Sequence, residues 1–414
     1  MRMHKVCYCE FGFLKEFFSS RPILTEPTEE NVHLLWTWVS LYKYLCKSEL
    51  ILDISSTYFT QLIDSYKDKS VDNKNNGEIA LLDVDFRSWL KLINKSEGLL
   101  SFTETNDRFP HISEFNQVEL DEQKLNAVYL TTSDDDSCKK HARLTGVIIL
   151  NNNLAKQCAH LFMDNGHAVP SEDAIDWGVL KKIKYPSLNI CNSIIIIDNY
   201  LFVDDKDKGN ITCEWPDKLK KNLRPIIQAL LPEMLDDKIV FEIAVFTAQE
   251  KEKDWKGFES QYNYIKTLLS EKKINYRINF YGKCHDAFHD RCILTNNVLI
   301  SSGRGFGIFT KNKETSKPTT INITFPFIQS NLLWCDGSFL NVLSKAKGIT
   351  DRLIEKDNYW GDDKRENRII SFYTNNNNIT KEPTQNIYSS IKPGMIIDLS
   401  KIKNYSKGRK YNYK

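Results

Sequence analysis

Apolar and polar positions in the second half of the chain follow two patterns, one typical of buried strands and one typical of amphipathic helices. The segment "NICNSIIIIDNYLF" is a continuous β-branched run, as expected of a strand covered on both faces. The same reasoning predicts strands at 189–202, 237–247, 274–282, 290–296, 297–303 and 319–328, and helices at 216–231, 255–273 and 337–356. Strands that alternate with helices predict an α/β layered domain.

The first half has a weaker pattern, but two passages in it are informative. The N-terminal segment "HKVCYCEFGFL" predicts a strand that ends at Glu10. Residues 124–150, "KLNAVYLTTSDDDSCKKHARLTGVIIL", predict a strand ending in Thr-Ser-Asp, a short helix, a glycine and a second strand. Open α/β sheets place their sites at the carboxyl ends of strands, so the acidic residues in these passages are candidates for chemistry.

The length of 414 residues exceeds what one hydrophobic core usually serves, which predicts two domains. Glycines and prolines between residues 165 and 190 indicate an inter-domain connection. The fold class is therefore predicted as two α/β domains, at 1–170 and 185–358. Residues 359–414 are basic and turn-rich, and are expected to form a tail.

Charge and cysteine usage exclude several classes of protein. The 56 basic and 54 acidic residues leave a net charge of +2, so any nucleic-acid site must be local. The ten cysteines include no C-x-x-C pair, which argues against a zinc ribbon or a redox motif. With no long apolar run, neither a membrane span nor a signal peptide is expected, and the predicted location is cytoplasmic.

Carboxylates at strand ends suggest a metal site. Glu10, Asp134 and Asp136 are the candidate catalytic residues and ligands for Mg²⁺ or Mn²⁺, because hard divalent cations take oxygen ligands and activate water against a phosphodiester. The alternative is structural: the segment "SDDDS" has the composition of a helix N-cap.

The passage "TTSDDDSCKKHARLTGVIIL" resembles the PIN-domain nucleases, in which an aspartate after a strand precedes a helix and a Gly-Val-Ile-type strand. The resemblance covers roughly residues 4–160 and puts Asp134 at the acidic position of the family, with Asp136 as an additional ligand. Glu10 stands where these proteins begin with aspartate. The middle carboxylate is not located: Asp53 and Asp64 are available, and Gln61 lies near the expected place. The resemblance implies metal-dependent cleavage of RNA.

A second motif lies in "HDRCILTNNVLISSGRGF", residues 289–306. Phospholipase-D-like enzymes use H-x-K-x4-D-x6-G-S-x-N, with histidine as nucleophile. This sequence matches those intervals with arginine in place of lysine and asparagine in place of aspartate, and it has one copy of the motif where catalysis normally needs two. The prediction is therefore a retained anion pocket without turnover, formed by His289, Arg291, Asn296 and Arg304.

The "HDR…GRGF" form resembles the phospholipase-D-like domain that accompanies microtubule-interacting-and-trafficking modules, over about residues 190–355. That family is known for phosphoinositide binding rather than hydrolysis. The combined hypothesis is a bacterial metal-dependent nuclease effector of phage defence or toxin type, with RNA as partner and a second domain for sensing or assembly. Two alternatives remain: a non-catalytic adaptor that binds nucleic acid or protein, and a phosphodiesterase completed by a homodimer.

Overall fold

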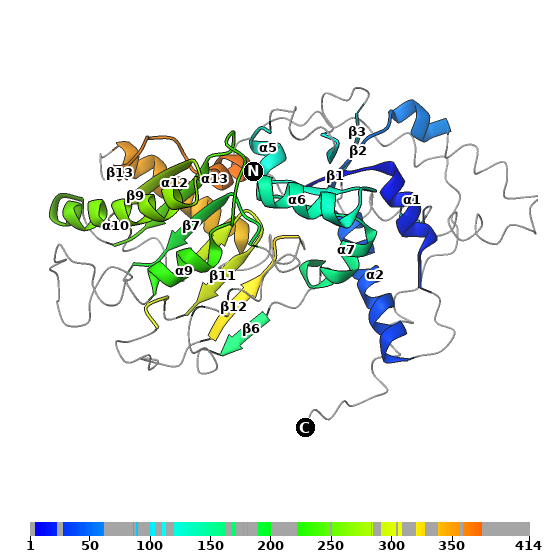
Figure 1. The fold of residues 1–414 in the computed structure, drawn as a ribbon, viewed down its shortest axis with the longest axis horizontal. Helices are drawn as coiled ribbons and strands as arrows, with labels where there is room; N and C mark the ends of the chain where they lie inside the picture. Colours follow the sequence, from blue (N-terminus) through cyan, green and yellow to red (C-terminus); the bar gives the residue numbers. More distant parts are fainter. Residues whose placement is uncertain are drawn as a thin grey trace, which may run out of the picture.

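The computed structural model arranges the chain as two β-sheets with helices packed on them (Figure 1). It describes residues 5–22, 28–61, 99–103, 110–112, 120–162, 167–170, 189–199, 222–248, 251–282, 291–303, 305–308, 320–327, 338–355 and 359–374, and the single positions 86, 88, 89, 177, 180 and 284. Within these ranges, no helix is both long enough and apolar enough to cross a bilayer.

The first sheet has five strands in the order β3-β2-β1-β4-β5, and every neighbouring pair is parallel. The strands are β1 (Val6–Cys9), β2 (Glu49–Leu52), β3 (Leu99–Phe102), β4 (Val128–Leu130) and β5 (Ile148–Leu150). The chain steps outward from β1 in one direction and from β4 in the other. Between β1 and β4 the strand order reverses, which is the place where open parallel sheets form a binding crevice.

Helices connect these strands and cover the sheet. They are α1 (Phe11–Ser19), α2 (Glu29–Lys47), α5 (Glu122–Leu125), α6 (Asp135–Thr145), α7 (Asn152–Gln157) and the 3₁₀ turn η2 (Ala159–Phe162). Because parallel crossovers are right-handed, helices that follow β1 and β4 lie on opposite faces. Accordingly α7 packs against α1 and α2, while α6 packs against β5 (Figure 1).

The second sheet is mixed and has the order β13-β9-β8-β7-β10-β11-β12-β6. Its strands are β6 (His167–Pro170), β7 (Ser193–Ile197), β8 (Phe241–Phe246), β9 (Tyr276–Tyr281), β10 (Arg291–Thr295), β11 (Leu299–Ser302), β12 (Thr320–Thr324) and β13 (Tyr359–Gly361). β7, β8 and β9 are parallel, and the other pairs are antiparallel. The predicted α/β class with two sheets is confirmed.

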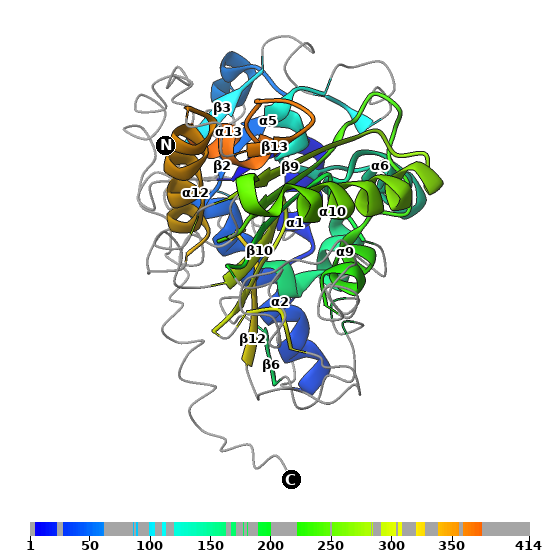
Figure 2. The same ribbon diagram turned by 90° about the vertical axis from the view of Figure 1, so that its left-hand side faces the viewer.

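Among the described residues, the helices of this sheet are α9 (Leu223–Leu230), α10 (Lys251–Glu271), α12 (Phe339–Glu355) and α13 (Arg368–Thr374). Figure 2 shows α12 on one side of the sheet and α9 and α10 on the other. Since both faces are covered, every residue of β7 is buried, which explains the unbroken isoleucine run.

Three elements lie where the sequence indicates something else. β6 falls inside the predicted first region of 1–170, yet it pairs with β12 of the second sheet. β13 and α13 fall inside the predicted tail of 359–414, yet β13 pairs with β9 and α13 is almost fully buried. Both strands are too short for a period of two to be recognised, and both are fixed by pairing with a distant strand. Residues 375–414 lie outside the described part of the chain.

The two sheets meet at the amino-terminal ends of their parallel strands. Asn192, just before β7, donates from Nδ2 to the carbonyl oxygens of Leu125 (2.8 Å) and Thr145 (3.1 Å). Asn296, in the turn between β10 and β11, donates from Nδ2 to Gly146 O (2.9 Å). The carboxyl-terminal ends of both sets of parallel strands therefore point away from this junction, in opposite directions.

Gly146 shows how closely the two regions approach. It ends α6 with φ +66°, a left-handed conformation that a residue without Cβ adopts freely. A Cβ at this position would lie 2.5 Å from the backbone of Cys191 in the second region. The "LTGV" glycine therefore both terminates a helix and permits contact between the two sheets.

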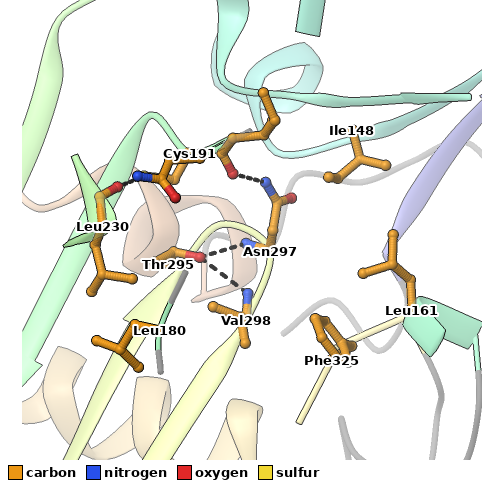
Figure 3. Close-up of a pocket in the computed structure, with 11 residues that line it drawn as sticks. Ile148, Leu161, Leu180, Cys191, Leu230, Thr295, Asn297, Val298 and Phe325 are labelled. Carbon is orange, nitrogen blue, oxygen red and sulfur yellow. Dashed lines mark hydrogen bonds between the residues drawn. The ribbon is translucent and has the colours of Figure 1, made fainter. Parts of the chain in front are cut away.

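Beside these hydrogen bonds, the junction contains a small, partly open pocket of about 40 Å³. Figure 3 shows the residues around it, which come from both regions and are mostly apolar. Asn297 is the main polar group: its Nδ2 donates to Ile190 O (2.7 Å), and Thr295 accepts from its backbone N–H (3.1 Å). The junction thus combines apolar packing with side-chain amides that donate hydrogen bonds to backbone carbonyls at the ends of helices and before strands.

Candidate functional site

The carboxyl edge of the first sheet gathers the polar residues that follow its strands. Glu10 follows β1, Asp53 follows β2, and the segment 131–134 follows β4. Cys9 pairs with Leu52 in the parallel register, so Glu10 and Asp53 leave neighbouring strands at the same level, one strand spacing apart. Glu10 and the segment after β4 flank the point where the strand order reverses.

Glu10 is held by residues from two different loops, Thr132 and His111. Its Oε2 accepts hydrogen bonds from Thr132 N (2.7 Å) and from Thr132 Oγ1 (2.7 Å). Its Oε1 lies 3.7 Å from Nδ1 of His111, and the Glu10 side chain is 13% exposed. A carboxylate with this many donors is fixed in position while it remains open to solvent on one side.

Asp53 lies next to Glu10, at the amino-terminal end of α1. Its Oδ1 accepts from Phe11 N (2.7 Å), the first residue of α1. Burial raises the pKa of the Asp53 carboxyl, the Phe11 N–H opposes that effect, and the negative charge of Glu10 raises it further. Two carboxylates held side by side repel each other, and a cation between them would relieve the repulsion.

Asp134 is the N-cap of α6. Its Oδ1 accepts from Ser137 N (2.8 Å) and its Oδ2 accepts from Ser137 Oγ (2.7 Å). These hydrogen bonds hold the pKa of the Asp134 carboxyl below its usual range. The capping alternative from the sequence is therefore present in the structure, and the side chain is turned toward its own helix.

Electrostatics still connects Asp134 with Glu10. Burial raises the pKa of the Cys138 thiol to about 12, and the charges of Asp135, Asp134 and Glu10 add to the effect. Asp135 is tied by Asn151 Nδ2 (2.7 Å) to the loop after β5. The acidic residues after β1 and β4 therefore both act on the same thiol, although Glu10 and Asp134 do not contact each other.

Asp136 lies exposed in the first turn of α6. Within the described ranges, no group of three or more His, Cys, Asp or Glu side chains is arranged to hold a metal ion. Mg²⁺ does not require such a group, because it keeps several waters and is commonly bound by one or two carboxylates. The pair Glu10 and Asp53 fits that requirement, and Asp64 lies outside the described residues.

The carboxyl edge of the second sheet carries part of the predicted anion pocket. Arg291 begins β10 and donates from Nη1 to Gly303 O (3.1 Å) at the end of β11. The buried carboxylate of Asp198, just after β7, accepts from Phe306 N (2.8 Å). Gly305 has φ +87°, and a Cβ there would lie 2.8 Å from Asp198 Oδ2, so the loop can close over this carboxylate only with glycine.

The other predicted members of that pocket are placed differently. Asn296 follows the far end of β10, so it lies about 17 Å along the strand from Arg291. Both ends of its amide are engaged at the junction, since Oδ1 accepts from Asn192 N (3.1 Å) and Nδ2 donates to Gly146 O. His289 and Arg304 lie outside the described residues.

Comparison with known proteins leaves the chain without an assigned family. No protein-family model matches it, and no curated protein matches it significantly. The fold and its edges define an α/β protein with an all-parallel sheet and a mixed sheet, each with acidic residues at the carboxyl ends of its strands.

Two residues at these edges, Asp198 and His111, are not predicted as site residues from the sequence, whereas Asp53 is considered there as an available middle carboxylate. Asp198 directly follows the isoleucine run, so a search for acids at the ends of predicted strands finds it. His111 has no such signal. It reaches Glu10 through a loop far from β1 in sequence, and only the tertiary structure brings the two together.

Proposed function

We propose that the chain is a metal-dependent nuclease effector that cleaves RNA at the carboxyl edge of its first sheet. The single observation that carries the proposal is the adjacent pair Glu10 and Asp53 beside a strand-order reversal, with a repulsion between the two carboxylates that a divalent cation would relieve. The resemblance of residues 4–160 to PIN-domain nucleases points to the same chemistry.

In this proposal Glu10 and Asp53 hold Mg²⁺ or Mn²⁺. Such an ion supplies a hydroxide nucleophile at neutral pH and stabilises the charge that develops on the phosphate. Thr132 fixes the Glu10 carboxylate with two hydrogen bonds, and the Phe11 N–H fixes Asp53. Because these contacts already fix both carboxylates, little conformational entropy is lost when the ion binds.

Cleavage of an end-labelled single-stranded RNA tests the proposal. The full chain should cut in Mn²⁺ or Mg²⁺ and not in EDTA. Glu10→Gln and Asp53→Asn should each reduce the rate by ~100-fold or more, since each removes a charge that holds the ion. Glu30→Gln, at an exposed position at the start of α2, is the matched control. Equal cleavage by Glu10→Gln and wild type would refute the proposal.

A contribution of the Asp134 charge to catalysis can be distinguished from the function of Asp134 as a helix cap. Asparagine caps helices about as well as aspartate, whereas alanine costs ~1 kcal/mol. If Asp134 contributes its charge to the site, Asp134→Asn should lose cleavage activity at unchanged thermal stability. Retained cleavage activity in Asp134→Asn would mean that Asp134 acts only as a helix cap. Cleavage activity and thermal stability of Asp136→Asn test the exposed Asp136 in the same way.

The second region is proposed to serve in sensing or assembly by binding the anionic group of a ligand or partner at Arg291 and Arg304. Arg291→Ala combined with Arg304→Ala should weaken binding of a short 5′-phosphorylated oligonucleotide by about 10-fold in filter binding, because two charge-assisted contacts are removed. His289→Ala should leave RNA cleavage unchanged. A phosphohistidine trapped at His289 would instead favour the phosphodiesterase alternative.

The second candidate is a non-catalytic adaptor. The observation in its favour is that Glu10 Oε2 and both oxygens of Asp134 already have internal donors. An adaptor should bind RNA or a protein partner without cutting in any metal. Full-length chain that binds RNA with the same affinity in Mn²⁺ and in EDTA, and leaves it intact, would establish this reading.

A further inference from the structure

A second pocket lies among α1, α2 and α7 on one face of the first sheet. It has a volume of about 280 Å³. The three helices lie side by side in Figure 1, and α7 packs against the other two. An apolar cavity of ~150 Å³ holds a benzene ring, so this pocket has room for a two-ring molecule.

Aromatic and aliphatic side chains form part of the walls, beside polar side chains: Ser20, Asn31, Thr37 and Asn152. Trp38 is the largest of the lining side chains. Its ring stacks on Phe17 (centroid separation 4.8 Å, interplanar angle 5°) and on Tyr42 (5.1 Å, 20°), so the buried ring is fixed and only a small part of it lines the pocket. Its indole N–H donates to Phe17 O (3.0 Å), so the ring is fixed and its polar edge is satisfied. Leu34 and Leu41 extend the apolar surface along α2. Such walls bind a flat apolar body without rearrangement.

The charge of the lining is one-sided. Lys156, exposed near the end of α7, is the charged side chain among the described lining residues, and it makes no ion pair with any described residue. A second cation lies close by, since the Arg21 guanidinium lies 5.6 Å from the centroid of the Trp38 ring. Glu16, the nearby acid on α1, is already engaged by Asn152 Nδ2 (3.1 Å). An anionic group at the mouth of the pocket would meet an unpaired ammonium.

From this geometry we infer that the pocket among α1, α2 and α7 binds a small aromatic anion, with its rings against the apolar side chains of α2 and its charged group at Lys156. This site is independent of the proposed nuclease chemistry, because its described lining residues include neither Glu10 and Asp53 nor the residues that contact these two carboxylates.

Two dyes of nearly the same shape test the inference: anilinonaphthalene sulfonate, which is anionic, and phenylnaphthylamine, which lacks the sulfonate. The full-length protein should bind one equivalent of each with enhanced fluorescence. Lys156→Glu should weaken the anionic dye by about fivefold or more and leave the neutral dye unchanged, since only the charge pair is lost. Lys272→Glu, at an exposed position on the second region, is the control for net charge.

Leu34→Trp fills the pocket from a partly exposed position and should weaken both dyes by at least ~10-fold while thermal unfolding stays as in wild type. Unchanged dye binding in a folded Leu34→Trp protein would place the dyes elsewhere and overturn the inference. Should that variant fail to fold, the comparison of Lys156→Glu with Lys272→Glu decides alone: equal affinities for the anionic dye in the two variants would overturn it.

Discussion

Replacing Lys5 by methionine is expected to raise the free energy of unfolding by about 4 kcal/mol at pH 6 and by little at pH 10.5. Lys5, the residue before β1, is 2% exposed. Its Nζ donates to Asn296 O across the junction and lies 5.0 Å from the centroid of the Phe327 ring. Burial lowers its pKa from 10.5 to about 7. One pKa unit corresponds to ~1.4 kcal/mol, so burying the charge costs about 5 kcal/mol. The methionine variant also loses the hydrogen bond of Lys5, which reduces the expected gain in stability by ~1 kcal/mol.

The sign follows from proton uptake on unfolding. Below pH 7 the ammonium is protonated in both states, and the whole burial cost is present. Between about pH 7 and 10.5 the unfolded chain binds a proton that the folded chain does not, so this residue makes stability rise with pH. Above 10.5 the lysine is neutral in both states and the cost is gone.

Urea unfolding of wild type and Lys5→Met at pH 6, 8 and 10.5 measures the difference, with the exposed Lys272→Met as control. The gap between wild type and Lys5→Met should close as the pH rises. A gap of the same size at all three pH values would mean that packing, rather than charge, accounts for the change.

Replacing Glu242 by glutamine is expected to lower the free energy of unfolding by about 3–5 kcal/mol. Glu242 lies at the start of β8, near the junction, with its side chain 4% exposed between two buried arginines. Its Oε1 lies 2.6 Å from Arg277 Nη2 and 3.3 Å from Arg368 Nη2, and its Oε2 accepts from Arg368 N (2.5 Å). Removing this one charge leaves two buried guanidiniums without their shared carboxylate.

Asp363→Asn is the matched comparison, because Asp363 also pairs with Arg277 (3.5 Å) but is 47% exposed, so water screens its loss to below ~1 kcal/mol. The Glu242→Gln effect should persist in high salt, since ions do not reach a buried pair. A second variant, Glu242→Leu with Arg368→Met, should recover part of the loss by replacing a charge pair with apolar packing. Additive losses in that double variant would show that the pair is not coupled.

The sequence by itself determined the fold class and much of the element order. The isoleucine run predicts β7, the period of 255–273 predicts α10, and "SDDDS" followed by a helical pattern and Gly146 predicts α6 with both of its caps. These signals are local: burial on both faces, a 3.6-residue period, and side chains that bond to backbone within a few residues. The presence of an acid after β1 was likewise readable, because Glu10 stands directly behind its strand.

Only the tertiary structure decided which acids share an edge and which amides face the junction. Asp134 has the right composition for a ligand, but two hydrogen bonds to Ser137 hold it as a cap. The sequence leaves Asp53 and Asp64 both available as the middle carboxylate, and only the parallel register places Asp53 beside Glu10. Asn296 occupies a motif position, but a contact with Gly146, 150 residues earlier, sets its environment. Such pairings depend on strand order and register, which are fixed by packing over long sequence separations and leave no periodic trace in the chain.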